Sequence, residues 1–117
     1  MLMASHSSIL IVNKTADFLK YLIPLLSRFP KHQRFMVADR IQHLLMEVLE
    51  IFVSAYYATP PERIMFLKQA NILIEKLRQY FRICYELGYY SSVKYSELSQ
   101  KLDEIGNMNG GWIRSLK

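Results

Sequence analysis

Three side chains with the chemistry of metal ligands are evenly spaced in one stretch of the chain: Asp39, His43 and Glu47. A spacing of four residues brings all three to one face of a helix. A di-iron site in a helical bundle also needs Glu-x-x-His motifs and further Glu ligands from other helices, and the sequence contains no Glu-x-x-His. We therefore interpret the three residues as a solvated polar stripe, and we predict no metal and no cofactor.

The sequence offers no recognisable catalytic nucleophile. Its lone cysteine, Cys84, falls on the apolar stripe of a predicted helix, which is typical of a small buried side chain rather than a reactive thiol. There is no Gly-rich phosphate loop, no Gly-x-Ser-x-Gly turn, no His-Glu-x-x-His helix and no pair of cysteines for zinc. The sequence therefore predicts a protein without catalytic residues, and an enzyme with a bundle metal site is the weakest alternative.

Positively charged residues carry the main functional signal. Lys and Arg number 15 against 10 Asp and Glu, which gives a formal net charge of +5. Arg78 and Arg82 lie one helical turn apart on a polar face that also includes Lys68, and clustered positive charge attracts the phosphate backbone of nucleic acids. Glu75 and Glu86 each lie within one turn of an arginine, so a solvated face with internal ion pairs is the alternative interpretation.

A second basic group falls where the first two predicted helices meet. It comprises Arg28, Lys31, His32 and Arg34, close to the start of the second helix, where exposed backbone N–H groups favour anions. Arg40 follows in the same helix. For Arg34 and Arg40 the alternative is an ion pair with an acidic residue, and the sequence leaves that choice open. The candidate partners are Asp39, Asp103 and Glu104.

Aromatic residues make up 13% of the chain and include 8 Tyr. Most of them fall at inward-facing positions of predicted helices, which favours core packing over stacking on unpaired bases. Tyr89 and Tyr90 are the least committed, because they follow Gly88 in a predicted loop.

Four helices separated by short breaks must position these residues. Apolar residues have helical spacing between the breaks at Phe29-Pro30, at Thr59-Pro60-Pro61 and from Gly88 to Ser92. Short connections make sequential helices antiparallel neighbours, so residues 13–117 predict an all-α fold, an antiparallel up-down four-helix bundle. Residues 1–12 would precede the bundle as an N-terminal segment that can be flexible. The predicted helices run from Asn13 to about Arg28, from Pro30 to about Tyr57, from Pro60 to Gly88, and from a cap at Ser91 or Ser92 to about Leu116.

Three of these helices carry a further expectation. Pro24 lies inside the first helix and should kink it or divide it in two. The apolar face of the second is broader than one neighbour would cover, so this helix should be central in the bundle or buried against another subunit. Gly106, Gly110 and Gly111 weaken the end of the fourth, so we expect fraying or a close approach to a neighbouring helix near Trp112.

Composition sets the class of protein. A chain of 117 residues that is 51% hydrophobic, with only 4 Gly and 4 Pro, predicts one domain with one core and excludes a disordered or collagen-like protein. One cysteine cannot form an internal disulfide, which fits a reducing compartment. The apolar stretch at residues 9–12 is too short for a signal peptide or a membrane span, so the predicted location is the cytoplasm and no membrane partner is expected.

The order and spacing of several stretches, taken together, are similar to a known family. These stretches are Phe29-Pro30-Lys31-x-x-Arg34-Phe35 with Ala38-Asp39-Arg40-Ile41-Gln42, Leu77-Arg78-x-x-x-Arg82, Glu86-Leu87-Gly88-Tyr89, and Leu102-Asp103-Glu104-Ile105-Gly106-x-Met108-x-Gly110-Gly111-Trp112-Ile113. From its first helix onward the chain resembles the bacterial four-helix bundle proteins encoded in ribosomal RNA intervening sequences and their relatives, the accessory variability determinants (Avd) of diversity-generating retroelements.

The Avd branch is the more similar of the two. Leu22-Ile23-Pro24 in the first helix and Gly110-Gly111-Trp112-Ile113-Arg114 near the end carry this distinction. Asn109 departs from the apolar residue expected between Met108 and Gly110.

The resemblance implies a protein with no catalytic centre that forms a ring of five subunits with a positive surface. It also implies association with the reverse transcriptase of the retroelement and with its RNA, in support of mutagenic cDNA synthesis. Five chains would carry a formal +25, which would attract RNA or DNA through the phosphate backbone. The apolar faces of the second and fourth helices would supply the subunit contacts.

By the same resemblance, Arg78 and Arg82 match basic positions that bind the partner. Lys68, Arg34, Arg40 and Lys31 are further candidates on the basis of their charge. The alternative function is that of the intervening-sequence branch, a structural or regulatory bundle with no polymerase partner.

Overall fold

Apolar residues that recur every three or four positions bury one face of each long helix, and these faces meet in a single core. The computed structural model describes the backbone of residues 2–117 and the side chains of residues 8–32 and 35–117. This backbone contains helices and connections but no strand. The elements are α1 (Leu2–Leu26), α2 (Lys31–Gln33), the π-helical turn η1 (Arg34–Ala38), α3 (Asp39–Tyr57), α4 (Pro60–Glu86) and α5 (Ser92–Ser115).

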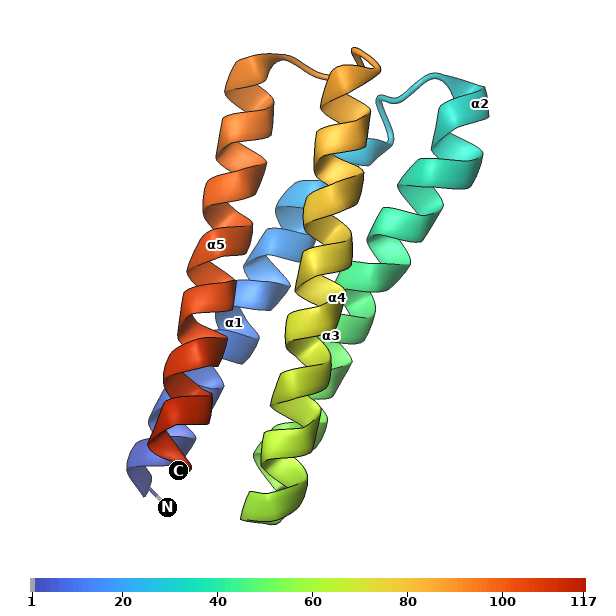
Figure 1. Ribbon diagram of the computed structural model, residues 1–117. Coiled ribbons are helices and arrows are strands. Elements are labelled where there is room, and N and C mark those ends of the chain that lie inside the picture. The colour runs from blue at the N-terminus through green and yellow to red at the C-terminus, as the bar shows by residue number, and fades with distance from the viewer. Residues whose placement is uncertain (1) are drawn as a thin grey trace.

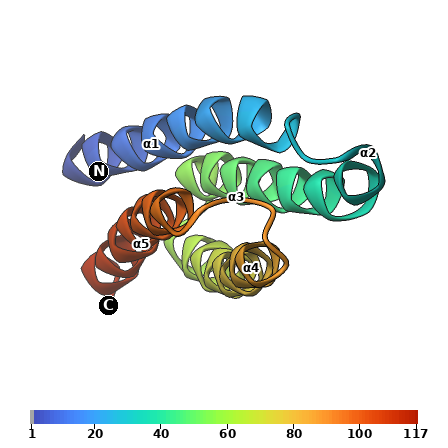
Figure 2. The ribbon, with the colours of Figure 1, turned by 90° about the horizontal axis from the view of Figure 1, so that it is seen from above.

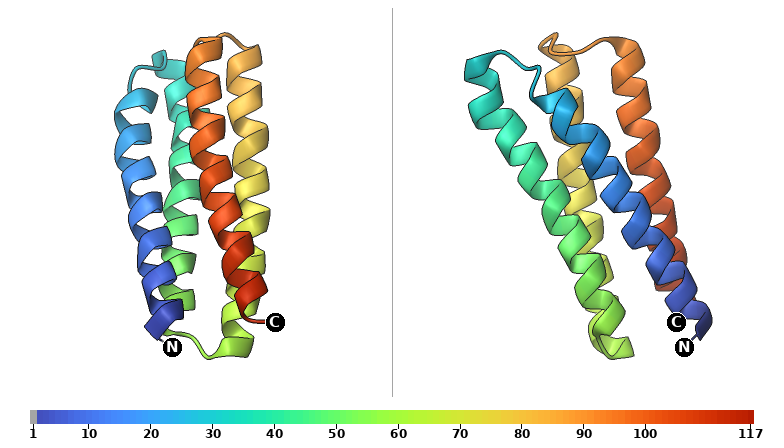
Figure 3. Two further views of the ribbon diagram at one scale, coloured as in Figure 1. Left: turned by 90° about the vertical axis from the view of Figure 1, so that its left-hand side faces the viewer. Right: turned by 180° about the vertical axis from the view of Figure 1, so that it is seen from behind.

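The four long helices α1, α3, α4 and α5 run alternately up and down, as the sequence predicted (Figures 1 and 3). The view from above shows α3 between α1 and α4, and α5 beside α4 (Figure 2). Contacts join α3 to α1 and α4, and α5 to α4 and α1, so each of the four helices packs against two others. The body is elongated, 45 × 23 × 20 Å, and both ends of the chain lie at the same end of it.

The buried apolar residues come from all four helices and form one cluster. Phe52 and Phe81 are the largest fully buried side chains. Phe81 also contacts Phe18 of α1, with ring centroids 6.2 Å apart. Other members of the cluster are Leu22, Ile41, Leu44, Val48, Leu67, Leu77, Leu98 and Leu102. Cys84 belongs to the same core and is fully buried, which confirms its interpretation as a packing residue. Burial raises the pKa of the Cys84 thiol to about 11.

The first helix begins earlier than predicted. It starts at Leu2, so Asn13 lies inside the helix and is not its N-cap. The buried stripe of α1 continues upstream through Ile11 to Ser8, and Thr15 is also buried. The Thr15 hydroxyl donates to the Ile11 carbonyl oxygen at 2.8 Å, which satisfies it within its own helix. Two polar residues on the inward face concealed these first turns from the apolar pattern.

Pro24 does not divide α1, so the expected division into two helices is wrong. The helix continues to Leu26, which places Pro24 in its last turn. Proline removes one backbone hydrogen bond, to the carbonyl oxygen of Lys20, and its ring crowds that carbonyl, but the helix has only two residues left after Pro24. The Ser27 hydroxyl donates to the Pro24 carbonyl oxygen at 2.6 Å as the chain leaves the helix.

The second predicted helix ends at Tyr57 as expected but starts irregularly. The short helix α2 leads into the π-helical turn η1, and only from Asp39 is the helix α-helical without interruption. A π-helical turn contains more residues than an α-helical one, so it changes which side chains face the core. Phe35 and Met36 are 84% and 76% exposed, whereas Ala38 is buried.

The connections at both ends of α4 form as the sequence predicted. Pro60 begins the helix, and Gly88 follows its C-cap with a φ of +79°, a left-handed conformation that glycine adopts without strain. Ser91 caps α5, and its hydroxyl accepts from the Lys94 backbone N–H at 3.1 Å. Arg63 adds a contact that the sequence did not predict. Its guanidinium donates to the carbonyl oxygens of Ala55, Tyr56 and Ala58 and so caps the end of α3.

The end of α5 remains helical despite its glycines. The helix extends to Ser115, and Trp112 is 4% exposed with its ring 6.5 Å from that of Phe52. The expected fraying is therefore not found. Asn109 is fully buried, and its Nδ2 donates to the Leu67 carbonyl oxygen at 2.9 Å and to Asn71 Oδ1 at 2.6 Å. A polar residue fits this position because α4 supplies its acceptors.

We predict that Asn109→Ala lowers the free energy of unfolding by about 1–3 kcal/mol, because it removes two buried hydrogen bonds between α4 and α5. Urea unfolding at a fixed protein concentration measures this loss. Asn107→Ala, at an exposed position of the same helix, is the matched control and should change stability by less than ~0.5 kcal/mol. Equal stability of Asn109→Ala and wild type would show that the polar contact does not hold the two helices together.

Candidate nucleic-acid and partner interface

Arg78 lies where α4 meets α5, and two carboxylates hold its guanidinium. Its Nε donates to Glu75 Oε1 at 3.0 Å, and its Nη1 donates to Asp103 Oδ1 on α5. Gly106 of α5 lies next to this guanidinium, and a Cβ at that position would be in ordinary van der Waals contact with Arg78 Nη2, at 3.5 Å. Partial burial lowers the pKa of Arg78, but the hydrogen bonds to Asp103 and Glu75 outweigh burial and raise it. The guanidinium thus remains charged and is compensated within the chain.

Arg82 follows one turn later on α4 and is exposed. Its Nη2 donates to Gln79 Oε1 at 2.8 Å, and it forms no ion pair with a described residue. The expected offset by Glu86 is not found. The interpretation as internal ion pairs therefore holds for Arg78 but not for Arg82, whose charge is free for an external anion.

Lys68 occupies the same side of α4, nearer its start. Residues 68, 75 and 82 are seven apart, so Lys68, Glu75 and Arg82 lie almost along one line on the helix surface. Lys68 is exposed and has no ion-pair partner among the described residues. At 1.5 Å per residue, Lys68 and Arg82 are separated by about 21 Å along the helix. They therefore mark the two ends of an extended surface and not one compact site.

The second basic group lies at the end of the bundle where α1 connects to α2. Lys31 is exposed on α2, and Arg40 is exposed in the first turn of α3. The side chain of Arg34 lies outside the described residues. The three acidic residues considered as partners are engaged elsewhere: Asp39 with His43 at 3.3 Å, Asp103 with Arg78, and Glu104 with Lys14 at 2.6 Å. Arg40 forms no ion pair with a residue whose side chain the structure describes.

The polar stripe of α3 is solvated, as its interpretation required. Asp39 and His43 contact each other, and both side chains are 62% exposed. Glu47 is also exposed. Within the described part of the chain, no three His, Cys, Asp or Glu side chains come close enough together to hold a metal ion.

Tyr89 and Tyr90 pack against the end of the core. Their ring centroids lie 5.3 and 5.9 Å from that of Phe29, a buried residue in the connection after α1. The Tyr90 hydroxyl donates to the Phe81 carbonyl oxygen, and burial raises the Tyr90 pKa. These two rings therefore join the two connections at this end of the bundle and are not platforms for bases.

A set of hydrogen bonds and ion pairs at the seam between α1 and α5 was not predicted from the sequence. The Tyr21 hydroxyl donates to Glu97 and accepts from Lys94 Nζ at 3.1 Å, and Lys94 also donates to Glu97 at 3.1 Å. These hydrogen bonds from Tyr21 and Lys94 lower the pKa of Glu97. Lys101 Nζ lies 4.6 Å from the Tyr21 ring centroid, in cation–π contact. Lys14 and Glu104 form a further ion pair along the same seam. Nearby carboxylates thus compensate much of the positive charge of this seam.

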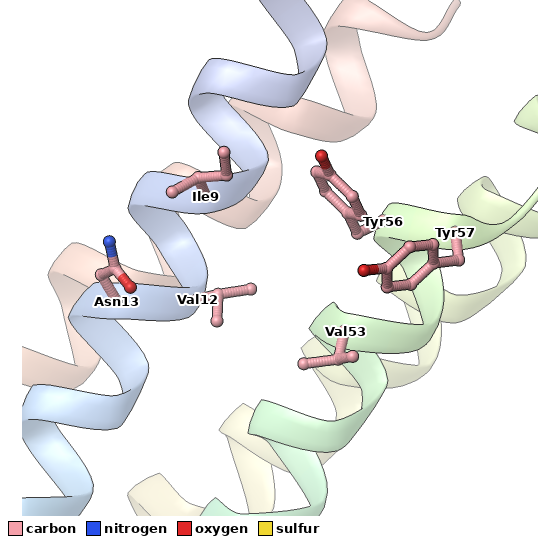
Figure 4. Close-up of a pocket in the computed structure, with 6 residues that line it drawn as sticks. All are labelled: Ile9, Val12, Asn13, Val53, Tyr56 and Tyr57. Atoms are coloured by element: carbon pink, nitrogen blue, oxygen red, sulfur yellow. The ribbon is translucent and has the colours of Figure 1, made fainter.

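The seam between α1 and α3 is apolar and open in comparison. A groove of about 240 Å³ lies there, lined by Ile9, Val12, Asn13, Val53, Tyr56 and Tyr57 (Figure 4). Ile9 is 50% exposed, Val53 42% and Tyr57 81%. None of the lining side chains carries a charge. This part of the second predicted helix thus has apolar surface that the bundle itself does not cover.

None of the helices in the described part of the chain is both long and apolar enough to cross a membrane.

Comparison with known proteins agrees with the resemblance seen in the sequence. No curated protein matches the chain at the required level of similarity. The sequence profile of a family described as bAvd-like matches residues 9–116. The matched region begins about two turns into α1 and ends at the C-cap of α5, so it includes part or all of every element of the bundle. The chain belongs to the bAvd-like family.

Proposed function

We propose that the protein is a non-enzymatic accessory protein of a diversity-generating retroelement. It acts as a basic oligomeric scaffold that binds the reverse transcriptase together with its RNA and cDNA and supports mutagenic cDNA synthesis. The observation that carries this proposal is the match to the bAvd-like family over residues 9–116. The absence of catalytic motifs from the sequence is consistent with such a role.

Uncompensated positive charge is the physical means of binding. Arg82 and Lys68 on α4, with Arg40 and Lys31 at the bundle end, are exposed and free of internal ion pairs with described residues. Backbone phosphates bind such side chains through charge and the release of counterions, without reading bases. Arg78 contributes differently in this proposal. It holds α5 against α4 through Asp103 and so positions the surface that Arg82 presents.

A closed ring would multiply this surface. A ring of five needs two different contact faces on each chain, because successive subunits join head to tail. The apolar groove between α1 and α3 is one candidate face. Met65 and Ile72, exposed at 71% and 59% one above the other on α4, make the second. In this arrangement the subunit contacts come from α1, α3 and α4, so the second predicted helix, α3, still contributes, and α1 and α4 contribute in place of the fourth.

The direct test of the function is co-expression with the reverse transcriptase and template RNA encoded beside this chain. We expect the three to purify as one complex and cDNA synthesis to require this protein. Undiminished cDNA synthesis without it would contradict the proposal. It would favour instead the structural or regulatory role of the intervening-sequence branch.

We predict that Arg82→Ala weakens RNA binding and leaves the fold stable, because the arginine is exposed and makes no ion pair. The slope of log Kd against log salt concentration should fall by about 0.7 for each phosphate of single-stranded RNA that the variant no longer binds. Arg78→Ala should instead lower the free energy of unfolding by up to about 1 kcal/mol, the usual contribution of partly exposed ion pairs.

Arg114→Ala is the matched control. It removes the same charge from the last turn of α5, away from Arg82 on α4. Fluorescence anisotropy over a salt series, with thermal unfolding of each variant, measures both effects. If Arg114→Ala weakened RNA binding as much as Arg82→Ala, net charge alone would explain binding and the assignment of Arg82 would be wrong.

We predict that Val53→Lys dissociates the ring, because it places a charge in the apolar groove. Light scattering should give about 69 kDa for the wild type, five times the 13.8 kDa of one chain, and about 13.8 kDa for the variant. His43→Lys adds a lysine at an exposed position on another face of α3 and should keep the wild-type mass. A monomeric wild type, or a Val53→Lys variant of unchanged mass, would contradict this interface.

A further inference from the structure

One stretch of the chain contains several basic residues and no acidic residue. Between Asp17 and Asp39 the sequence has four Lys or Arg residues and one His, and no Asp or Glu. In the structure its second half forms the connection after α1, then α2 and η1, at one end of the bundle (Figure 1). Arg28, Lys31 and His32 are exposed there, and none of them forms an ion pair with a described residue.

Phe35 and Met36 follow on η1, four and five residues after Lys31. Phe35 is 84% exposed, the largest exposed fraction among the large apolar side chains that the structure describes. An exposed aromatic ring near basic side chains is an arrangement that binds unpaired nucleotides, with a base on the ring and phosphates on the cations. The nearest carboxylate in the sequence, Asp39, contacts His43.

The surrounding structure holds the Phe35 segment in place from both sides. Upstream, Phe29 is buried against Tyr89 and Tyr90. Downstream, Ala38 and Ile41 are buried in the core. The π-helical turn between them is a rare geometry that recurs at functional sites. The backbone around Phe35 is therefore fixed on both sides. Little further conformational entropy is lost when a ligand binds to the ring.

We propose that this basic tip, formed by Arg28, Lys31, His32 and Phe35, binds single-stranded nucleic acid, with an unpaired base stacked on Phe35. The proposal rests on the proposed function and names the form of nucleic acid that the scaffold takes. A duplex conceals the faces of its bases, so it would gain only the phosphate contacts. The tip therefore prefers unpaired RNA or cDNA.

The size of the exposed patch favours single-stranded nucleic acid over a protein partner or a membrane. A specific protein interface buries on the order of 1,000 Å² or more, and stable attachment to a membrane needs a long amphipathic face or a lipid anchor. Two adjacent apolar side chains on a single turn are small for either of these. The ring of Phe35 matches the size of one base.

The test compares binding of a labelled 20-nucleotide oligouridylate, the same backbone without bases, and a duplex of that length. The wild type should bind the oligouridylate most tightly. Phe35→Leu keeps an apolar side chain but removes the aromatic face, so it should weaken oligouridylate binding about tenfold and leave binding of the abasic strand unchanged. Phe35→Trp should retain wild-type affinity.

Met36→Ala is the matched control, since Met36 is the equally exposed neighbour without a ring, and its affinity should stay within about twofold of wild type. Thermal unfolding checks that each variant folds, and the exposure of Phe35 predicts unchanged stability. Wild-type binding by Phe35→Leu would overturn the proposal, as would equal losses in Phe35→Leu and Met36→Ala.

A loss in Phe35→Leu confined to sedimentation with phosphatidylserine vesicles would also overturn the proposal, in favour of a membrane. The proposed function fails separately, if the wild type binds none of the three nucleic acids and no reverse transcriptase. If Arg82→Ala weakens binding and Phe35→Leu does not, the proposed function is retained, but the basic tip is not the site that binds the nucleic acid.

Discussion

The surface of this bundle is determined by which cations find a carboxylate across a helix seam. Arg78 reaches Asp103 from α4 to α5, and Lys14 reaches Glu104 from α1 to α5. Both contacts require the helices to pack in one register, which the buried apolar stripes and the Asn109 contact specify. The ion pairs then leave a defined remainder of positive charge on α4 and at the end of the bundle. The proposed function depends on that remainder and not on the net charge.

Much of the fold could be predicted because local residue choices agree with it. Pro60, Gly88 and Ser91 each mark a helix boundary for a local physical reason, and the structure confirms all three. The start of α1 could not be found in the same way, because Ser8 and Thr15 occupy buried positions that an apolar pattern counts as exposed. The π-helical turn η1 also has no local signal in this sequence, since it interrupts a stretch of ordinary helical spacing.

The basic residues of the candidate site could be chosen from the sequence, but not which of them are paired within the bundle. Arg78 and Arg82 look equivalent in the sequence, one turn apart on one helix face. They differ in the structure because Asp103, 25 residues further along the chain, lies beside Arg78. Tyr21 and Glu97 are likewise joined across 76 residues. Such pairs depend on helix register, which a single sequence does not specify.

The most direct test of the account is to map where RNA contacts the protein. Ultraviolet cross-linking of the purified protein to its RNA, followed by mass spectrometry, identifies the linked peptides. The account predicts cross-links in peptides that contain Lys68 and Arg82 and in the segment at residues 28–36, with few in the compensated seam of Lys14, Lys94 and Lys101. Cross-links concentrated in that seam would contradict the claim that charge left over from internal ion pairs forms the binding surface.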